Sequence, residues 1–274
     1  MQNSDHNNQH RLALITGATG AIGKAIALAI AQQPGHRVVL LCRDEQKAEQ
    51  AVREIRDQTG NDRVSHETVD VSSKDSIKAL AERINDPVQV LVNNAAITPP
   101  HRQETPEGIE LQFATNVLGY FWLTRALTDQ LKAGSPSRVV NVASYWAGDL
   151  DLDDLEFKHR PYNNNTAYRQ SKQANRMLTV AFAERLREHG ITVNACHPGD
   201  VNSKLSNNLG FGGHESPGQG AQTPAWLATD PIGQEETGKY FERMEMQRCR
   251  FGENSKAVAA LFETCEAYYH QPQL

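Results

Sequence analysis

The feature that most restricts the fold is a short apolar strand, a glycine-rich turn and an Ala- and Ile-rich helix in direct succession near the start of the chain. Residues 11–15 are predicted to form the strand and residues 16–23 the turn, and the helix continues to about Gln33. Such a turn lets the backbone approach a diphosphate, which the positive end of the helix attracts. The alternative is a tight turn that binds nothing. If the turn binds a dinucleotide, the residues in contact with it are Thr16, Gly17, Thr19, Gly20, Ala21, Ile22 and Gly23.

The rest of the chain repeats this alternation of apolar strands and helices. Alternation of this kind predicts a parallel sheet with helices on both faces. Strands are expected near 38–42, 63–69, 88–92, 138–143, 190–195 and 238–241, and helices near 45–58, 74–85, 113–124, 168–186 and 255–269. We therefore expect an α/β protein with a Rossmann-type doubly wound parallel sheet in three α/β/α layers. It forms a single domain over residues 11–274, after a disordered tail of residues 1–10.

The composition excludes several classes of protein. The 274 residues carry a net charge of −5 without a basic block, so no nucleic-acid partner is expected. The four cysteines lie far apart and form no Cys-x-x-Cys pair, which argues against a disulfide framework and a metal site. The first ten residues are polar, and no apolar run is long enough to span a bilayer. We expect a cytoplasmic protein with no membrane anchor and no metal.

The end of the second strand indicates which dinucleotide is bound. An acidic residue there would grip the ribose 2′-hydroxyl of NAD(H), whereas Arg43 can pair with the 2′-phosphate of NADP(H). Asp44 follows directly, but it can instead cap the next helix. NADP(H) is therefore favoured over NAD(H).

The next two strands end in polar residues at the same edge of the sheet. Asp70, followed by Val71, could hydrogen-bond the adenine amino group, or it could belong to the turn before a helix that Ser72 or Ser73 caps. Asn93 and Asn94, followed by Ala95, could stitch neighbouring loops together at the edge of the cofactor site.

A tyrosine and a lysine four residues apart, Tyr168 and Lys172, open an apolar-periodic run to Leu186. Residues at this spacing share one face of a helix. A phenol has a pKa of about 10, so bringing it near neutrality requires roughly 4 kcal/mol. An ammonium about 5 Å away supplies about 3 kcal/mol at an effective dielectric near 20. Tyr168 could then act as a general acid or base, although a surface helix can carry such a pair by chance.

Two further polar residues are candidates for the same site. Ser144 follows a strand at the sheet edge where open α/β sheets bind ligands, and its hydroxyl could hydrogen-bond a substrate carbonyl. Asn116 interrupts an otherwise apolar helix, so its amide needs partners or water. It is either a satisfied core amide or the holder of an ordered water beside Lys172.

Together these motifs resemble the short-chain dehydrogenase/reductase family over nearly all of residues 11–270. The resemblance implies that Ser144 positions a carbonyl, Tyr168 transfers the proton and Lys172 binds the nicotinamide ribose and lowers the tyrosine pKa. It also implies that Asn116 holds a water for a proton relay. The segment Pro198-Gly199-Asp200-Val201 would pass beside the nicotinamide, with the backbone of Val201 near its carboxamide.

Within the family, the local sequence is most similar to the retinol-dehydrogenase-like branch, most clearly in residues 41–44, 167–175 and 197–199. That branch tends to use NADP(H) on retinoids, steroids and other apolar carbonyls, and its membrane-bound members carry an N-terminal anchor. In relatives the helices that contain Asn116 and Tyr168 commonly form a dimer interface, so a homodimer or homotetramer is compatible with the resemblance.

The segment from Ser203 to about Asp230 is rich in Gly, Pro, Asn and Gln, which predicts a long loop that covers the substrate as a lid over residues 203–230. Apolar contacts to the substrate are expected from Leu205, Leu209, Phe211 and Trp226, and from Tyr145 and Trp146 beside Ser144.

The expected activity is NADP(H)-dependent hydride transfer between a carbonyl and an alcohol on a small, partly apolar substrate. Two alternatives stay open. One is a protein that senses NADP(H) and catalyses little. The other is a sugar-nucleotide epimerase that retains NAD, because the spacing of Gly17, Gly20 and Gly23 follows that longer branch of the family.

Overall fold

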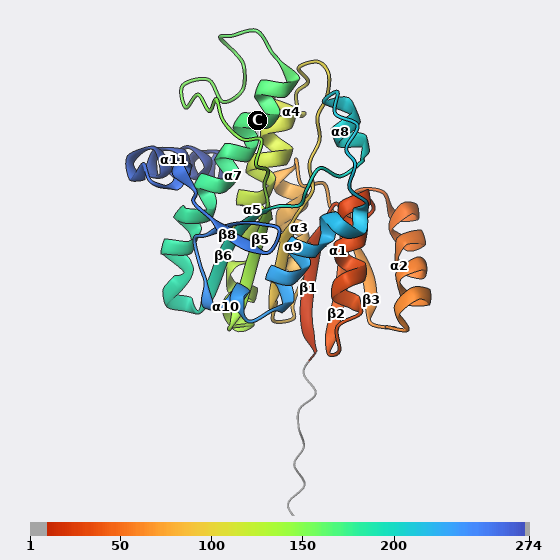
Figure 1. The fold of residues 1–274 in the computed structure, drawn as a ribbon. Helices are drawn as coiled ribbons and strands as arrows, with labels where there is room; N and C mark the ends of the chain where they lie inside the picture. The colour runs from red at the N-terminus through yellow and green to blue at the C-terminus, as the bar shows by residue number, and fades with distance from the viewer. Residues whose placement is uncertain (1–9, 272–274) are drawn as a thin grey trace, which may run out of the picture.

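The computed structural model describes residues 10–271, and its core is one mostly parallel β-sheet (Figure 1). Over these residues the sheet has eight strands in the order β3-β2-β1-β4-β5-β6-β7-β8, with only β8 antiparallel to its neighbour. The strands are β1 (Arg11–Thr16), β2 (His36–Cys42), β3 (Val64–Thr68), β4 (Val90–Asn93), β5 (Ser137–Val142), β6 (Ile191–His197), β7 (Tyr240–Glu242) and β8 (Glu245–Gln247).

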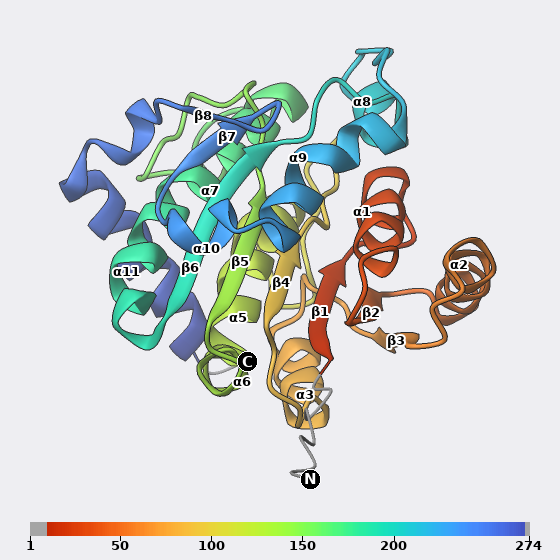
Figure 2. The same ribbon diagram turned by 60° about the horizontal axis from the view of Figure 1, so that its bottom comes forward.

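Helices cover both faces of the sheet (Figure 2). One face carries α1 (Ala21–Ala31), α2 (Glu45–Thr59), α9 (Pro217–Thr229) and α10 (Ile232–Glu235). The other face carries α3 (Lys74–Arg83), α5 (Gly119–Ala126), α6 (Thr128–Ala133), α7 (Asn164–Leu186) and α11 (Ser255–His270). Two short helices, α4 (Leu111–Phe113) and α8 (Lys204–Asn208), lie in connections. The predicted three-layer doubly wound fold is confirmed.

The central strands bury both of their faces, which explains why they are continuously apolar in sequence. Successive side chains of a strand point to opposite faces. Leu14 and Leu91 accordingly join the core beneath α5 and α7, whereas Ile15 and Val92 join the core beneath α1 and α9. The sheet therefore has an apolar core on each face. The loops that follow the strands lie at its carboxyl edge.

The segment from Ser203 to Asp230 differs from the predicted loop. Residues 217–229 form α9, which packs against α1 and begins with a capping box between Ser216 and Gln219. Trp226 packs against the core, 5.8 Å from the ring of Phe241, so the expectation that it contacts substrate is wrong. The buried side of this helix is made largely of Gly and Ala, and such small residues gave no apolar pattern by which to predict it.

Smaller differences occur at the ends of the chain. The hairpin between β7 and β8 was not predicted beyond its first strand. Asn254, rather than Ser255, caps α11 by accepting a hydrogen bond from the main-chain N–H of Ala257. The predicted disordered tail lies outside the described residues, apart from His10. Within residues 10–271 no helix combines the length and the apolar character that crossing a bilayer requires.

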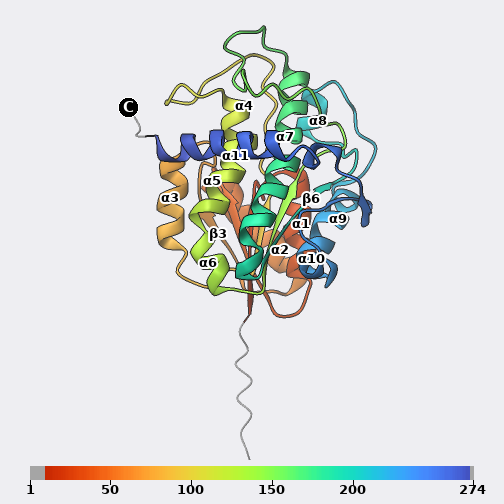
Figure 3. The same cartoon turned by 90° about the vertical axis from the view of Figure 1, so that its left-hand side faces the viewer.

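The C-terminal helix α11 lies across α5 and α7 (Figure 3). The ring of Phe262 lies 5.0 Å from that of Phe121 on α5 and 5.2 Å from that of Phe182 on α7. These are the two helices for which the family resemblance predicts a dimer interface. The chain's own C-terminal helix therefore covers part of their outer surface.

Candidate active site

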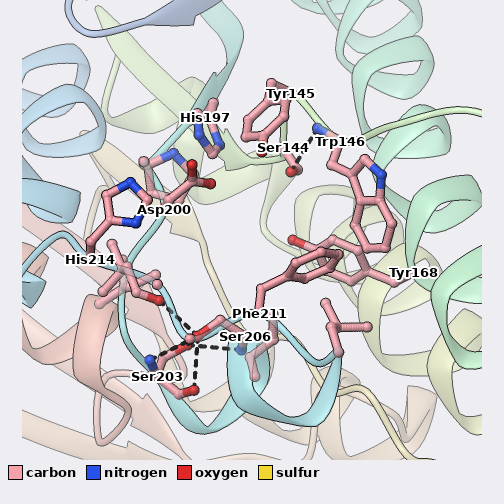
Figure 4. A pocket seen from close by; sticks show the side chains of 18 of the residues that line it. Ser144, Tyr145, Trp146, Tyr168, His197, Asp200, Ser203, Ser206, Phe211 and His214 are labelled. Atoms are coloured by element: carbon pink, nitrogen blue, oxygen red, sulfur yellow. Dashed lines mark hydrogen bonds between the residues drawn. The ribbon is translucent and has the colours of Figure 1, made fainter.

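A cavity of about 440 Å³ opens at the carboxyl edge of the sheet, where β5 and β6 end and α7 begins (Figure 4). Ser144 follows β5, His197 ends β6 and Tyr168 lies in the first turns of α7. The residues that line it are Ile22, Ser144, Tyr145, Trp146, Tyr168, His197, Pro198, Gly199, Asp200, Val201, Ser203, Leu205, Ser206, Leu209, Gly210, Phe211, Gly212, Gly213 and His214. This edge is where open α/β sheets place their ligands.

Tyr168 and Ser144 lie next to each other in the wall of this cavity. Both side chains are buried. Burial raises the pKa of Tyr168 to about 12, and the neighbouring Ser144 hydroxyl opposes that rise. The Ser144 hydroxyl also accepts a hydrogen bond from the main-chain N–H of Trp146, 3.0 Å away, which holds it at the strand end. Tyr168 is therefore an un-ionised phenol, the form that can donate a proton.

Lys172 lies one turn further along α7, beneath Tyr168. Its Nζ atom donates a hydrogen bond to the main-chain carbonyl of Val142 at 2.9 Å and lies 5.7 Å from the centre of the Tyr168 ring. Burial lowers the pKa of Lys172 to about 7. The expected acidification of the phenol is not seen in the chain by itself, because the loss of hydration outweighs the nearby ammonium.

Asn116 lies in a π-helical turn, Ala114–Leu118, between α4 and α5. Its amide oxygen accepts from the main-chain N–H of Ile97 at 2.9 Å, and its nitrogen donates to the Ile97 carbonyl at 3.0 Å and to Ser171 Oγ at 3.3 Å. Such turns occur often at functional sites. The amide is thus a satisfied core group that ties the loop after β4 to the helix of Tyr168.

The glycine-rich turn packs closely against the loop after β4. Gly17 has a φ of +64°, and a Cβ atom there would lie 2.9 Å from the Cα of Ala95. A Cβ atom on Gly23 would lie 2.4 Å from the Gly17 carbonyl oxygen and 2.6 Å from Asn94 Nδ2. Thr16 Oγ1 accepts hydrogen bonds from the main-chain N–H groups of Asn94 and Ala95. Glycines are required here so that strand, helix and loop can meet.

The start of α1 is suited to a phosphate group. Gly20 is the capping residue, and no side chain accepts a hydrogen bond at this helix end. The main-chain N–H groups of Ala21 and Ile22 begin the helix, with Thr19 just before it. Free N–H groups together with the helix dipole attract anions. The residues present therefore fit a dinucleotide diphosphate.

Arg43 is exposed directly after β2 and makes no ion pair with another described residue. Asp44 instead caps α2, because its carboxylate accepts from the Lys47 N–H at 3.0 Å and pairs with the Lys47 ammonium at 2.6 Å. Of the two roles considered for Asp44, the structure shows the capping one. After β2, the Arg43 guanidinium is therefore the charged group that stays available to a ligand.

Asp70 is part of the turn that leads into α3. Its carboxylate accepts from the main-chain N–H and the hydroxyl of Ser72, and Ser73 caps the helix. Val71 is buried, with its carbonyl beside the backbone of Gly119. Both hydrogen bonds from Ser72 use Oδ1 of Asp70. Its Oδ2 atom is therefore the one that could accept a hydrogen bond from an adenine.

The side chains of several cavity residues were given no individual role from the sequence, notably His197, Asp200, Ser206 and His214. The sequence signals were only the place of Asp200 in the segment after β6 and the place of Ser206 and His214 in the predicted lid. Pro198, Gly199 and Val201 line the same cavity. Over residues 10–271 no group of His, Cys, Asp and Glu is arranged to hold a metal ion.

Comparison with known proteins agrees with this geometry. The family model described as short chain dehydrogenase matches residues 11–211. Retinol dehydrogenase 13 of Homo sapiens is 36% identical over 257 residues, which cover 86% of this chain and 77% of that protein. Retinol dehydrogenase 14 of Homo sapiens is 33% identical over 262 residues, covering 84% of this chain and 77% of that protein.

Solved structures give the same result. An uncharacterized protein from Mycobacterium paratuberculosis superimposes with a TM-score of 0.80 at 28% identity, covering 96% of this chain and 95% of that one. A metagenomic short-chain oxidoreductase in complex with NADP gives a TM-score of 0.65 at 26% identity, covering 86% of this chain and 97% of that one.

Proposed function

Because the chain belongs to the short-chain dehydrogenase/reductase family, in the retinol-dehydrogenase-like branch, it is an oxidoreductase, and we propose that it interconverts a carbonyl and an alcohol with NADP(H). The observation that carries this proposal is the position of Ser144 and Tyr168 side by side in the cavity wall, with Lys172 beneath them. A hydroxyl pair of this kind can hold a carbonyl oxygen and protonate it.

In the direction of reduction, Tyr168 donates its phenolic proton to the substrate oxygen, and Ser144 holds that oxygen by a hydrogen bond. The phenol is buried, so little water competes for its proton. When bound, NADPH supplies the hydride. Lys172 would hold the ribose of the cofactor and offset charge that develops on Tyr168. Asn116 holds the loop at Ile97 against α7.

The proposed cofactor is NADP(H) rather than NAD(H). Arg43 supports this choice, because a guanidinium is the side chain best suited to bind a phosphate. The use of Asp44 as a helix cap supports it too, since a capping carboxylate is not free to bind a 2′-hydroxyl. Asp70, Asn94 and the turn of Gly17, Gly20 and Gly23 complete the proposed contacts.

The proposed substrate is an aldehyde or ketone with an apolar part. Leu205, Leu209 and Phe211 come from the segment around α8, and Trp146 faces them from beside Ser144. The lid role is therefore proposed for about residues 203–214 only, within the single domain of residues 11–274. The names of the relatives point to retinol as one alcohol of this class.

The two alternatives make different demands on the same site. A sensor of NADP(H) needs none of Ser144, Tyr168 and Lys172, whereas all three gather at one cavity edge here. A sugar-nucleotide epimerase, favoured by the glycine spacing, would retain NAD tightly. Denaturing the purified protein and identifying the released nucleotide separates the epimerase from an enzyme that exchanges NADP(H).

The proposed function is tested by a screen of aldehydes, ketones and alcohols, read by the absorbance of NADPH. Turnover of at least one apolar carbonyl with NADPH is expected. Absence of any turnover with either cofactor, in protein that binds NADPH, would favour the sensor.

A further inference from the structure

We infer that the substrate cavity selects a carbonyl compound that carries a positively charged nitrogen, held by Asp200 and the surrounding aromatic rings. The inference rests on the proposed carbonyl–alcohol activity of the same cavity and names the chemical class of its substrate. It concerns the side chains of Asp200, in the loop after β6, and Tyr145, which line the cavity and have no part in the proposed chemistry (Figure 4).

Asp200 supplies the only carboxylate among the described residues that line the cavity, and no lysine or arginine lines it. Its carboxylate lies beside the Tyr145 hydroxyl, and its charge also acts on Tyr168. The carbonyl oxygen of Asp200 accepts hydrogen bonds from the main-chain N–H groups of His214 and Glu215, at 2.9 and 3.0 Å. These bonds fix the backbone of the loop, and the side chain of Asp200 extends into the cavity (Figure 4).

The neighbouring histidine does not neutralise this carboxylate. Burial lowers the pKa of His197, whose Nδ1 atom is buried without a hydrogen-bond partner in the described chain. The imidazole is therefore neutral at pH 7. The charges that act on it are three carboxylates, Asp200, Glu242 and Glu215, against one guanidinium, Arg243. This side of the cavity is thus negative.

Aromatic rings make up the rest of the wall. Trp146 lies 6.0 Å from Tyr168 and 4.7 Å from Phe211, measured between ring centres, and Tyr145 lies 4.6 Å from His197. Tyr145 and Phe211 are about half exposed, at 51% and 48%, although large aromatic side chains are normally well covered. Aromatic faces combined with a carboxylate are the chemistry that recognises alkylammonium groups. Asp200 is exposed, so its carboxylate is open to a ligand, and a purely apolar substrate would offer it no partner of opposite charge.

The test compares two aldehydes of the same shape, para-formylbenzyltrimethylammonium and para-neopentylbenzaldehyde, as substrates with NADPH. In the wild type we expect kcat/KM to be about tenfold or more higher for the cation. In Asp200→Asn that ratio should fall about tenfold, and Asp200→Glu should largely retain it. Using the ratio within each variant removes any general change in activity. Asp57→Asn, an exposed aspartate on α2, serves as the matched control and should keep the wild-type ratio.

A binding measurement separates this inference from the proposed function. Benzyltrimethylammonium should bind to NADP-loaded wild type in isothermal titration calorimetry, with a Kd about tenfold higher in Asp200→Asn. Binding without turnover of either aldehyde would support the cation site and overturn the proposed function. Turnover of the neutral aldehyde without binding of the cation would support the proposed function and overturn the cation site. The inference is also overturned if Asp200→Asn changes the relative affinity for NADP⁺ and NADPH but leaves the cation unaffected.

Discussion

The ammonium of Lys172 donates a hydrogen bond to the carbonyl of Val142, the last residue of β5, across 2.9 Å. This bond joins α7 to the sheet directly beneath the candidate active site. The lysine is buried, and its Nζ atom lies 5.4 Å from the centre of the Tyr120 ring and 5.7 Å from that of the Tyr168 ring. Burial of this charge costs free energy, and that cost depends on pH.

Lys172 should make the protein more stable as the pH rises above neutrality. Its folded pKa is about 7, whereas in the unfolded chain it is about 10.5, so between these values the unfolded state binds more protons. The penalty is fully present below pH 7 and disappears as the pH approaches 10.5. In urea denaturation, Lys172→Met should remove about 5 kcal/mol of this pH dependence.

Lys132→Met is the matched control, since Lys132 is exposed on α6 and should leave the dependence unchanged. When variants are compared at the same pH, the contributions of titratable groups that all of them share, such as the buried thiols of Cys196 and Cys265, cancel in the difference of unfolding free energy. If Lys172→Met and wild type have parallel curves of unfolding free energy against pH, Lys172 is not a buried group of lowered pKa.

Tyr168→Phe should lose turnover and keep the cofactor. The substitution removes only the hydroxyl that donates the proton, and loss of a general acid lowers kcat by about a thousandfold. NADPH affinity, measured by cofactor fluorescence, should change little. Tyr269→Phe on α11 provides the control for loss of a hydroxyl remote from the cavity. Full activity in Tyr168→Phe would eliminate the proposed mechanism.

Arg43→Asp should shift the preference from NADP(H) toward NAD(H). The change replaces the group that would pair with the 2′-phosphate by one that repels it. A loss of about tenfold or more in kcat/KM for NADPH relative to NADH is expected. Arg63→Asp, another exposed arginine, should leave the ratio as in the wild type. An unchanged ratio in Arg43→Asp would show that this guanidinium does not contact the cofactor.

Much of the fold follows from local sequence. The strand, turn and helix at residues 11–33 and the apolar strands after them were recognisable because both faces of the central strands are buried. The location of Ser144 and Tyr168 at one edge also followed, since the carboxyl ends of parallel strands meet there. These features depend on neighbours in sequence or on the general geometry of α/β sheets.

Features that depend on distant packing were not predictable. α9 was hidden by its Gly and Ala residues, whose burial requires the close approach of α1. The polar wall around Asp200 was missed because its significance lies in what faces it across the cavity. The raised pKa of Tyr168 was likewise missed, since the sequence shows the spacing to Lys172 but not the burial of both groups.

Phe262→Ala on α11 should destabilise the protein by about 3–5 kcal/mol, because it leaves a cavity between the rings of Phe121 and Phe182. The loss would show that α11 is an integral part of the layer formed by α5 and α7. Phe211→Ala removes an equal side chain from a half-exposed position and should cost far less. Urea denaturation measures both. Equal small losses would mean that α11 rests weakly on these helices, and the α5–α7 face would again be open to a partner subunit.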